Sequence, residues 1–287
     1  MRERVLVAGS TGYLGRFMIK ELKERGYWIR ALCRNKEKIQ LVGHYVDELF
    51  IAKATNPDTL NGLCRGIDCV FSSLGITKQK EGFTYMDVDY QANRNILDQA
   101  LAERVSKFIY VSVLNADKIK HLQIVKAKER FCEELRGSDV EYLIIRPNGF
   151  FSDIGQVFKM AQRGTVYLLG SGEYPGNPIH GQDLAQACVD HLDLASGEVD
   201  IGGPEILSQN EIAAQAFEVL GKKEKILHFP LLAAKLFLKV IRSVTSVKTY
   251  GPLEFFLTVL TMDMIAPRYG THTIRQYFTE LRNGKAM

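Results

Sequence analysis

Short runs of apolar, β-branched and aromatic residues recur through the first half of the chain, separated by stretches in which apolar residues return every three or four positions. Six runs have the length and composition of β-strands: residues 4–8, 27–33, 48–52, 68–73, 107–112 and 141–146. Helical spacing lies between several of them, over residues 14–25, 90–103 and 124–136. Because parallel strands need long crossovers, this alternation predicts an α/β fold, a doubly wound parallel sheet of Rossmann type with helices on both faces.

The alternation loosens after residue 150, and a smaller, mostly helical C-terminal lobe is expected. We predict one domain over residues 1–150 and a second over 151–287, with segments near 178–202 returning to the core sheet. Asp183 directly precedes an apolar helical pattern and is the expected N-cap of that helix. Ser208, with Glu211 three residues later, has the spacing of a capping box.

The most apolar stretch, ILHFPLLAAKLFLKVIRSVTSV, covers residues 226–247. Its cations Lys235, Lys239 and Arg242 recur at helical spacing, which interrupts the stretch too often for a membrane-spanning helix. We expect an amphipathic helix that packs on the smaller lobe. The alternative is peripheral contact with a membrane surface through residues 226–262.

Composition narrows the class of protein only slightly. The 287 residues are 46% hydrophobic and 24% charged, and a net charge of +4 spread along the chain does not favour a nucleic-acid partner. The five cysteines include no C-x-x-C pair and lie mostly within apolar runs, so we expect buried, reduced thiols and neither a disulfide nor a metal site. A strand pattern begins within three residues of the N-terminus, so a cytoplasmic protein without a signal peptide is expected. The oligomeric state is left open.

Residues 5–16, VLVAGSTGYLGR, place three glycines between the first strand and the first helix. In such a loop one glycine permits a tight turn, another lets the backbone approach a pyrophosphate, and the third lets helix and strand pack closely. The helix N-terminus adds free N–H groups and a partial positive charge. Although the spacing is G-x-x-G-x-x-G, at Gly9, Gly12 and Gly15, its position between strand and helix predicts a dinucleotide site.

The end of the second strand indicates which dinucleotide is bound. NAD sites usually carry an acidic residue there, whereas this chain reads ALCRNKEK, with Arg34, Lys36 and Lys38. Guanidinium and ammonium groups suit a 2′-phosphate, and Arg16 could add to the same charge. The sequence therefore predicts NADP(H), with a solvated basic segment as the alternative.

Seven blocks of the chain resemble the atypical short-chain dehydrogenase/reductases of the NmrA-like group, and within it the branch that contains divinyl chlorophyllide 8-vinyl reductases. The resemblance covers about residues 4–215. Its blocks are AGSTGYLG, CRN, DYQANRNILDQA (89–100), KFIYVSVLNAD (107–117), AKERFCEELRGSDVEYLIIRPNGFF (127–151), IHGQDLA (179–185) and IGGPEILSQNEIA (201–213).

The resemblance implies roles for particular residues. Lys128 stands where the family carries the lysine of Y-x-x-x-K, and Ser112 where it often carries an active-site serine, so these two are the expected catalytic residues. RPNGFF (146–151) would line the nicotinamide end of the cofactor. The full expected cofactor-binding set is Gly9, Ser10, Thr11, Gly12, Tyr13, Leu14, Gly15, Arg34, Lys38, Thr55, Leu74, Gly75, Val111, Ser112, Lys128, Pro147, Asn148 and Phe150.

The catalytic tyrosine of the family is absent, because Ile124 occupies its place four residues before Lys128. Three interpretations remain open. Lys128 or an ordered water is the acid; Tyr85, Tyr110 or His180 replaces the phenol; or no chemistry occurs. His180 is equally compatible with a structural role.

A second departure from the family is Lys53, where relatives usually carry an Asp near the adenine; its side chain would face the phosphate or point into solvent. The glycine loop, the basic residues after the second strand and the apolar C-terminal third together predict an NADP(H)-dependent oxidoreductase. It would transfer hydride to a C=C or C=O bond of a small-molecule substrate that is bulky and apolar. A non-catalytic NADP(H) sensor or assembly protein is the alternative.

Overall fold

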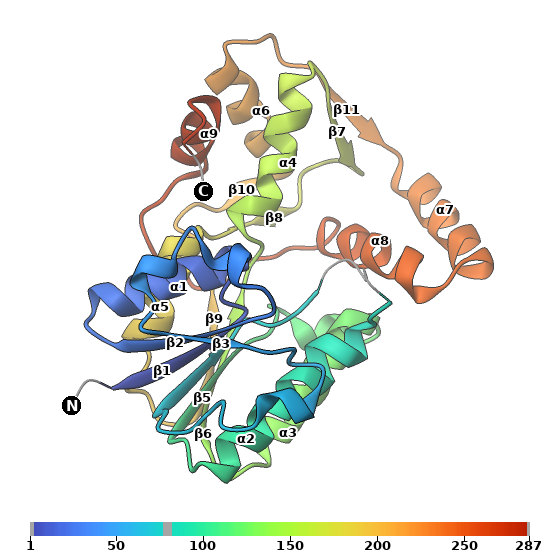
Figure 1. Cartoon of the computed structure of the whole chain (residues 1–287). Helices are drawn as coiled ribbons and strands as arrows, with labels where there is room; N and C mark the ends of the chain where they lie inside the picture. The colour runs from blue at the N-terminus through green and yellow to red at the C-terminus, as the bar shows by residue number, and fades with distance from the viewer. Residues whose placement is uncertain (1–2, 77–81, 286–287) are drawn as a thin grey trace. The chain divides into compact units, whose positions relative to one another are not determined.

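The computed structural model describes residues 3–76 and 82–285, and the chain divides into two compact units (Figure 1). The first unit comprises Met1–Arg146 and Leu184–Val199, and the second comprises Pro147–Asp183 and Asp200–Met287. The chain thus crosses between the units three times.

A seven-stranded sheet forms the centre of the fold, with the strand order β3-β2-β1-β4-β5-β6-β9. Its strands are β1 (Arg4–Ala8), β2 (Trp28–Cys33), β3 (Glu48–Ile51), β4 (Cys69–Ser72), β5 (Lys107–Val111), β6 (Glu141–Pro147) and β9 (Gly197–Ile201). The pairs from β3 to β6 are all parallel, with Val5 opposite both Ile29 and Cys69. Every residue of β4 and β5 is buried, as strands covered on both faces require. The predicted doubly wound parallel sheet is confirmed.

The helices of the first unit lie on both faces of this sheet; Figure 1 shows α2 and α3 on the opposite face from α1. They include α1 (Tyr13–Glu24), α2 (Asn93–Ala102) and α3 (Gln123–Arg136), with short 3₁₀ turns at Lys36–Ile39, Gly43–Tyr45, Pro57–Leu60 and Ala116–Ile119. Each of the three buries one apolar stripe, which in α1 includes Leu14, Met18 and Leu22.

The helix expected to begin at residue 90 begins earlier, as a π-helix (η4, Met86–Ala92) that continues into α2. The side-chain amide of Asn93 donates to the backbone carbonyls of Leu74, Val88 and Asp89. These bonds draw the last turn of the π-helix toward the loop after β4. Single π-turns of this kind are frequent at functional sites.

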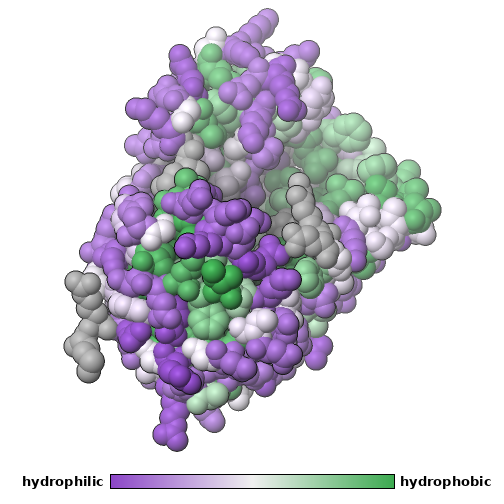
Figure 2. Space-filling model, viewed as in Figure 1, coloured by the Kyte–Doolittle hydropathy of each residue, from purple (hydrophilic) through white to green (hydrophobic). Residues whose placement is uncertain are grey.

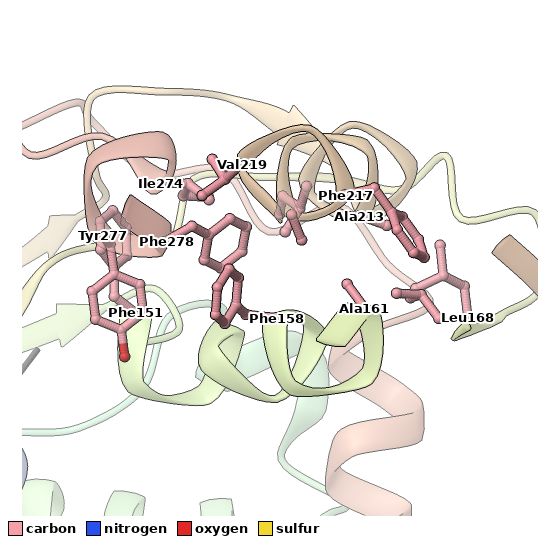
Figure 3. Packing of buried hydrophobic residues seen from close by; sticks show 13 residues of the cluster. Phe151, Phe158, Ala161, Leu168, Ala213, Phe217, Val219, Ile274, Tyr277 and Phe278 are labelled. Carbon is pink, nitrogen blue, oxygen red and sulfur yellow. The ribbon is translucent and has the colours of Figure 1, made fainter. Parts of the chain in front are cut away.

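The second unit has its own apolar core, in which aromatic rings dominate (Figure 3). Its elements are α4 (Phe151–Gln162), β7 (Val166–Leu169), β8 (Pro175–Gly176), β10 (Leu207–Ser208), α6 (Gln209–Leu220), β11 (Ile226–Phe229), α7 (Leu231–Val244), α8 (Val247–Val259) and α9 (Ile274–Arg282). Phe158 of α4 stacks on Phe278 of α9, with ring centroids 5.2 Å apart. Ser208 and Glu211 form the predicted capping box at the start of α6.

The prediction for Asp183 is wrong. Helix α5 (Gly181–Asp190) begins two residues earlier, and the backbone N–H of Gln182 donates to Nδ1 of His180 instead. The Asp183 carboxylate accepts hydrogen bonds from the backbone N–H groups of Thr271 and His272 and lies 2.6 Å from Nδ1 of His272. Asp183 therefore anchors the loop before α9.

The apolar stretch 226–247 is not one helix. Its first four residues form β11, which pairs in parallel with β7, and Pro230 separates that strand from α7 because proline favours a helix start and cannot donate within a helix. No residue of α7 is buried, and four of its residues, Leu231, Ala234, Leu238 and Ile241, are half-buried, so the helix packs on the smaller lobe less closely than expected. Within the described ranges, none of the helices is long and apolar enough to cross a membrane.

Candidate nucleotide and active site

Strands β1 and β4 are neighbours in the sheet. From β1 the chain continues to β2 and β3 on one side, and from β4 it continues to β5 and β6 on the other, so the order of strands reverses between β1 and β4. In open α/β sheets this reversal leaves a crevice at the carboxyl ends of the two strands, where ligands bind. The loops after β1 and β4 touch: a Cβ atom on Gly9 would lie 2.7 Å from the Ser73 hydroxyl. The predicted glycine loop therefore lies at the switch point.

The three glycines have different geometry. Gly9 has φ +84°, which favours glycine, and its carbonyl accepts a hydrogen bond from the Gly12 N–H at 2.9 Å, closing a tight turn. A Cβ on Gly15 would lie 2.1 Å from that same carbonyl, so only glycine permits this packing of α1. Gly12 is exposed and caps α1 without a side-chain bond, and no acidic residue occupies the first turn. The N–H groups and partial positive charge of the helix are thus offered to an anion.

The side chains between these glycines mostly point into the protein. Ser10 is fully buried, and its hydroxyl donates to the Leu32 carbonyl of β2 at 2.7 Å. Leu14 is buried in the core, while Thr11 and Tyr13 are half-buried, with Tyr13 packed edge-on against Phe17. The predicted nucleotide contacts of Ser10 and Leu14 can therefore be made only by their backbone.

The basic residues after β2 are exposed. Arg34 precedes a 3₁₀ turn (Lys36–Ile39) that contains Lys38. Asn35 caps this turn, and its side-chain oxygen accepts from the Glu37 N–H at 2.8 Å. Lys53, after β3, is exposed as well, and Thr55 beside it is half-buried.

Lys128, on α3, lies against the carboxyl ends of β4 and β5. Its Nζ is 3.2 Å from Oδ1 of Asp89, 3.3 Å from the carbonyl of Val111 and 5.3 Å from the centre of the Tyr110 ring. A Cβ on Gly75 would lie 2.6 Å from Asp89 Oδ1 and 3.0 Å from Lys128 Nζ. The structure thus brings together Gly75, Val111 and Lys128 from the predicted set and adds Asp89.

Asp89 is the residue that the sequence analysis missed. Its side chain is completely buried, and Oδ2 accepts from the Ile76 N–H at 3.1 Å. Among the residues that the structure describes, Oδ1 has no partner besides the ion pair with Lys128. Burial raises the pKa of Asp89, and the charge of Lys128 opposes that rise. The feature of the sequence that could have indicated Asp89 is its pairing with Asn93, since these are two polar residues one turn apart on the buried side of a helix.

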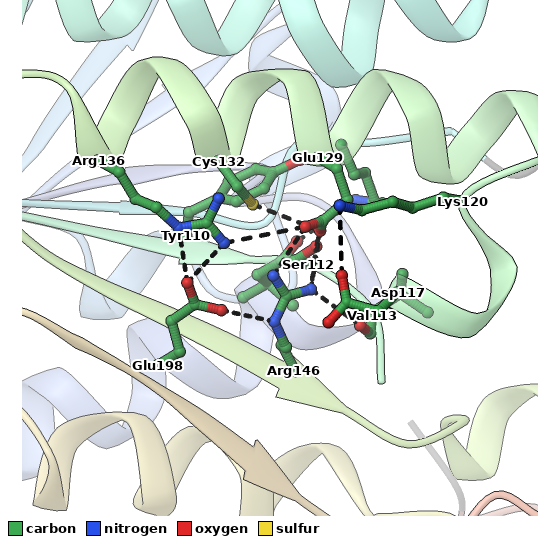
Figure 4. A network of polar contacts seen from close by, with 12 residues as sticks. Tyr110, Ser112, Val113, Asp117, Lys120, Glu129, Cys132, Arg136, Arg146 and Glu198 are labelled. Atoms are coloured by element: carbon green, nitrogen blue, oxygen red, sulfur yellow. Dashed lines mark hydrogen bonds and ion pairs between the residues drawn. The ribbon is translucent and has the colours of Figure 1, made fainter. Parts of the chain in front are cut away.

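Ser112 is committed to a different cluster, drawn in Figure 4. Its buried hydroxyl donates to Oε1 of Glu129 at 2.8 Å, and both carboxylate oxygens of Glu129 are bound by the Arg146 guanidinium at 2.7 and 2.8 Å. Burial alone would raise the pKa of Glu129, but the hydrogen bonds and charge of Arg146 outweigh it, so the pKa is lowered. The Ser112 hydroxyl is thus held in a buried network with Glu129 and Arg146, and its catalytic role stays a prediction.

The three candidate replacements for the tyrosine are also placed. Tyr110 is fully buried, its hydroxyl lies 3.4 Å from the Asp89 carbonyl, and burial raises its pKa far above the usual value. Tyr85 is buried in the first unit. His180, in the second unit, stacks on His272, and burial and that neighbour lower its pKa to about 4. Tyr110 is therefore a poor proton donor, and His180 is neutral at pH 7.

Pro147, Asn148 and Phe150 belong to the second unit. The side-chain amide of Asn148 is buried and donates to Oδ1 of Asn177 at 2.9 Å and to the carbonyl of Met264. Phe150 is half-buried at the N-cap of α4. Asn148 thus has internal partners, and Phe150 is the more accessible of the two.

Three observations on the first unit fit a dinucleotide. They are the uncapped helix start behind Gly12, the exposed cations after β2, and the Asp89–Lys128 ion pair beside Gly75. Residues 9–194 match the family described as NAD(P)H-binding. The chain belongs to this NAD(P)H-binding family.

The relatives of the chain include members of the branch that the sequence resembles. The chain is 26% identical over 325 residues to the chloroplastic divinyl chlorophyllide a 8-vinyl-reductase of Arabidopsis thaliana, covering 98% of this chain and 78% of the relative. It is 26% identical to the photosystem II assembly factor Ycf39 of Guillardia theta, covering 79% and 73%. AtPrR2, solved with NADP⁺ and (+)-pinoresinol, shares the fold, with a TM-score of 0.77 at 16% identity and coverage of 97% and 98%. The assignment to the atypical short-chain dehydrogenase/reductases is confirmed.

Proposed function

We propose that the chain is an NADP(H)-dependent oxidoreductase of the atypical short-chain type, which reduces a C=C or C=O bond of a bulky apolar substrate. The observation that carries the proposal is the Lys128–Asp89 pair beside Gly75, at the carboxyl ends of β4 and β5. A buried acid paired with a lysine, placed where a dinucleotide is expected, is typical of a catalytic site rather than of a surface ion pair.

The nucleotide would be held by the backbone of the glycine loop at its diphosphate and by Arg34 and Lys38 at its 2′-phosphate. When bound, NADPH supplies the hydride. Lys128 would bind the nicotinamide ribose. Thr55 and Leu74 would border the adenosine.

Lys128 is the proton donor in this proposal. The usual phenol is replaced by Ile124, which is buried and carries no proton, and Tyr110 is enclosed by protein. The Lys128 ammonium is a charged donor near the switch point, and Asp89 fixes its position from the buried side. Asp89 is therefore a positioning residue, and Ser112 stabilises the strand end through Glu129.

The proposed substrate class is supported by the names of one relative, a vinyl reductase, and one structural neighbour, a pinoresinol-bound protein. Both names denote bulky, largely apolar molecules. The apolar C-terminal third of this chain is consistent with a ligand of that class.

A second function is favoured by Ile124 together with the relative named as an assembly factor. In that case the chain would bind NADP(H) and respond to whether the bound nucleotide is oxidised or reduced, without transferring hydride to a substrate. The oxidised and reduced nucleotides would then differ in affinity, because a ligand shifts a conformational equilibrium only by its differential affinity.

Replacing Lys128 distinguishes the two functions. NADPH consumption is measured with a panel of enones, quinones and vinyl-substituted tetrapyrroles, for the wild type, Lys128→Met and the exposed neighbour Lys126→Met as the matched control. A reductase should lose kcat by on the order of a hundredfold in Lys128→Met, within the range for a general acid, with a smaller change in NADPH affinity. Retained turnover in Lys128→Met would contradict its role as proton donor. A wild type that reduces no probe but binds NADP⁺ and NADPH with different affinities would favour the sensor.

A further inference from the structure

Helix α7 presents apolar side chains on two opposite sides. Leu231, Leu238 and Ile241 are half-buried on the side that faces α8, where the two helices pack. The opposite side carries Leu232, Leu236, Phe237, Val240 and Val244, whose exposed fractions range from 54 to 81%. Helical spacing places these five residues on one face, which we call the outer face of α7.

Exposed apolar residues also lie on the strand pair β7–β11, whose strand β11 is joined to α7 by Pro230. Leu227 and Phe229 of β11 are 46% and 56% exposed, and they alternate along the strand, so both point to the same side. Tyr167 of β7 lies directly opposite Leu227 and is 58% exposed. Figure 2 shows apolar side chains gathered over the part of the surface to which α7 belongs. Patches of this extent on a water-soluble surface mark interaction sites.

Lysines border the outer face. Residues 225–253 contain Lys225, Lys235, Lys239, Arg242 and Lys248 and no aspartate or glutamate, and Arg242 is ion-paired with the largely buried Glu254 of α8 at 3.0 Å. Lys235 and Lys239 are exposed one turn apart along the edge of the outer face. A helix with an apolar face bordered by lysines matches the interface of an anionic bilayer, where the apolar residues enter the acyl region and the ammonium groups reach the lipid phosphates.

We propose that the outer face of α7, together with Tyr167, Leu227 and Phe229, docks on the surface of an anionic lipid membrane. A second copy of the chain fits this surface less well. A two-fold contact would bring the same lysine-bordered face against itself, with like charges opposed and no acidic residue on α7 to pair them. This inference does not rest on the proposed reductase activity, because binding to lipid is measured without substrate.

Flotation of the full-length protein with vesicles tests the proposal. The two vesicle types are phosphatidylcholine alone and phosphatidylcholine containing 30% phosphatidylglycerol. The variants are Leu236→Glu with Phe237→Glu, which charges the outer face, and Lys235→Gln with Lys239→Gln, which removes two cations. Leu41→Glu is the matched control, since Leu41 is 64% exposed and Leu236 63% exposed, but Leu41 lies in the first unit.

The wild type and Leu41→Glu should float with the anionic vesicles, and high salt should weaken that binding only in part, because insertion of apolar groups is not screened. The double glutamate variant should lose binding to both vesicle types. The double glutamine variant should bind the anionic vesicles about tenfold or more weakly, because each lysine near an anionic surface contributes roughly fivefold in affinity. Circular dichroism would establish that the variants are folded.

Two results would overturn the proposal. One is failure of the wild type to float with anionic vesicles. This includes the case in which sedimentation shows that the wild type is a dimer and the double glutamate variant is a monomer. The other is equal flotation of the wild type and the folded double glutamate variant.

Discussion

Nζ of Lys128 lies 3.2 Å from Oδ1 of Asp89, and the Asp89 side chain has no exposed surface. Burial raises the pKa of this carboxyl, so the ionised form costs free energy in the folded state. The charge of Lys128 and the Ile76 N–H offset part of that cost. The pair is therefore better explained by the position it gives the lysine than by any gain in stability.

Asp89→Asn should separate those two effects. Because the folded pKa is raised, ionised Asp89 destabilises the native state at neutral pH, and the neutral amide removes that cost. The free energy of unfolding at pH 7 should stay the same or increase, while turnover falls about tenfold as Lys128 loses its fixed position, a loss of roughly 1.4 kcal/mol in transition-state stabilisation. Urea unfolding and steady-state kinetics measure the two quantities, with the exposed Asp98→Asn as control. Full turnover in Asp89→Asn would remove Asp89 from the site.

Arg34→Ala tests the choice of nucleotide. The substitution should weaken NADP(H) binding by about 1.5–3 kcal/mol, because a charge-assisted bond to the 2′-phosphate is lost, and should leave NAD(H) binding nearly unchanged. Isothermal titration with both nucleotides measures the difference, and the exposed Arg65→Ala serves as control. If the wild type binds NAD(H) as tightly as NADP(H), the assignment of Arg34 is wrong.

Gly15→Ala tests the geometry of the glycine loop. The new methyl group would lie 2.1 Å from the Gly9 carbonyl, so α1 or the loop must shift. We expect a loss of about 2 kcal/mol or more in stability, as overpacking costs, together with loss of nucleotide binding. Gly43→Ala is the control, since its methyl group would meet only an ordinary contact at 3.9 Å. Thermal unfolding with and without NADPH gives both readouts, and an unchanged Gly15→Ala protein would refute the close packing.

The Ser112–Glu129–Arg146 cluster should stabilise the fold without taking part in turnover. Glu129→Gln leaves Arg146 without its bidentate carboxylate and should cost about 3 kcal/mol at pH 7, whereas Ser112→Ala should cost about 1 kcal/mol and retain turnover. Because the folded pKa of Glu129 lies below 4.5, its contribution is present above pH 4.5 and is lost as the pH falls through the folded value. Unfolding curves between pH 7 and pH 3 should therefore show a shallower acid loss in Glu129→Gln than in the exposed control Glu133→Gln. A large loss of kcat in Ser112→Ala would restore its catalytic role.

Local pattern was sufficient for much of the fold. The strand over residues 4–8 is observed with those bounds because a short apolar run ends there in the glycine loop, and Ser208 caps α6 because its partner Glu211 is only three residues away. These elements depend on neighbours in the sequence. The glycine loop is predictable for the same reason.

Other features depend on contacts that the sequence does not display. The Asp89–Lys128 pair joins the π-helix before α2 to α3, and these two elements, far apart in the sequence, pack together only in the folded chain. Strand β11 was missed because its apolar residues run on into those of α7, and Pro230 was the available signal. An amphipathic pattern also cannot distinguish a helix that covers a core from one with a second apolar face outward, as α7 has.

The transfer of hydride from NADPH is tested most directly with NADPH that carries deuterium at the reactive C4 position. The protein is incubated with this cofactor and with the enones and vinyl-substituted tetrapyrroles of the panel, and each product is analysed by mass spectrometry. Quinones are left out because the O–D of a hydroquinone exchanges with water. A reductase should deliver one deuterium to the reduced product for each NADPH oxidised, with either the 4R or the 4S label alone, and Lys128→Met should still bind NADPH while forming little product. If neither label reaches any product, or if NADPH is not consumed with any probe, the chain does not act as the reductase proposed.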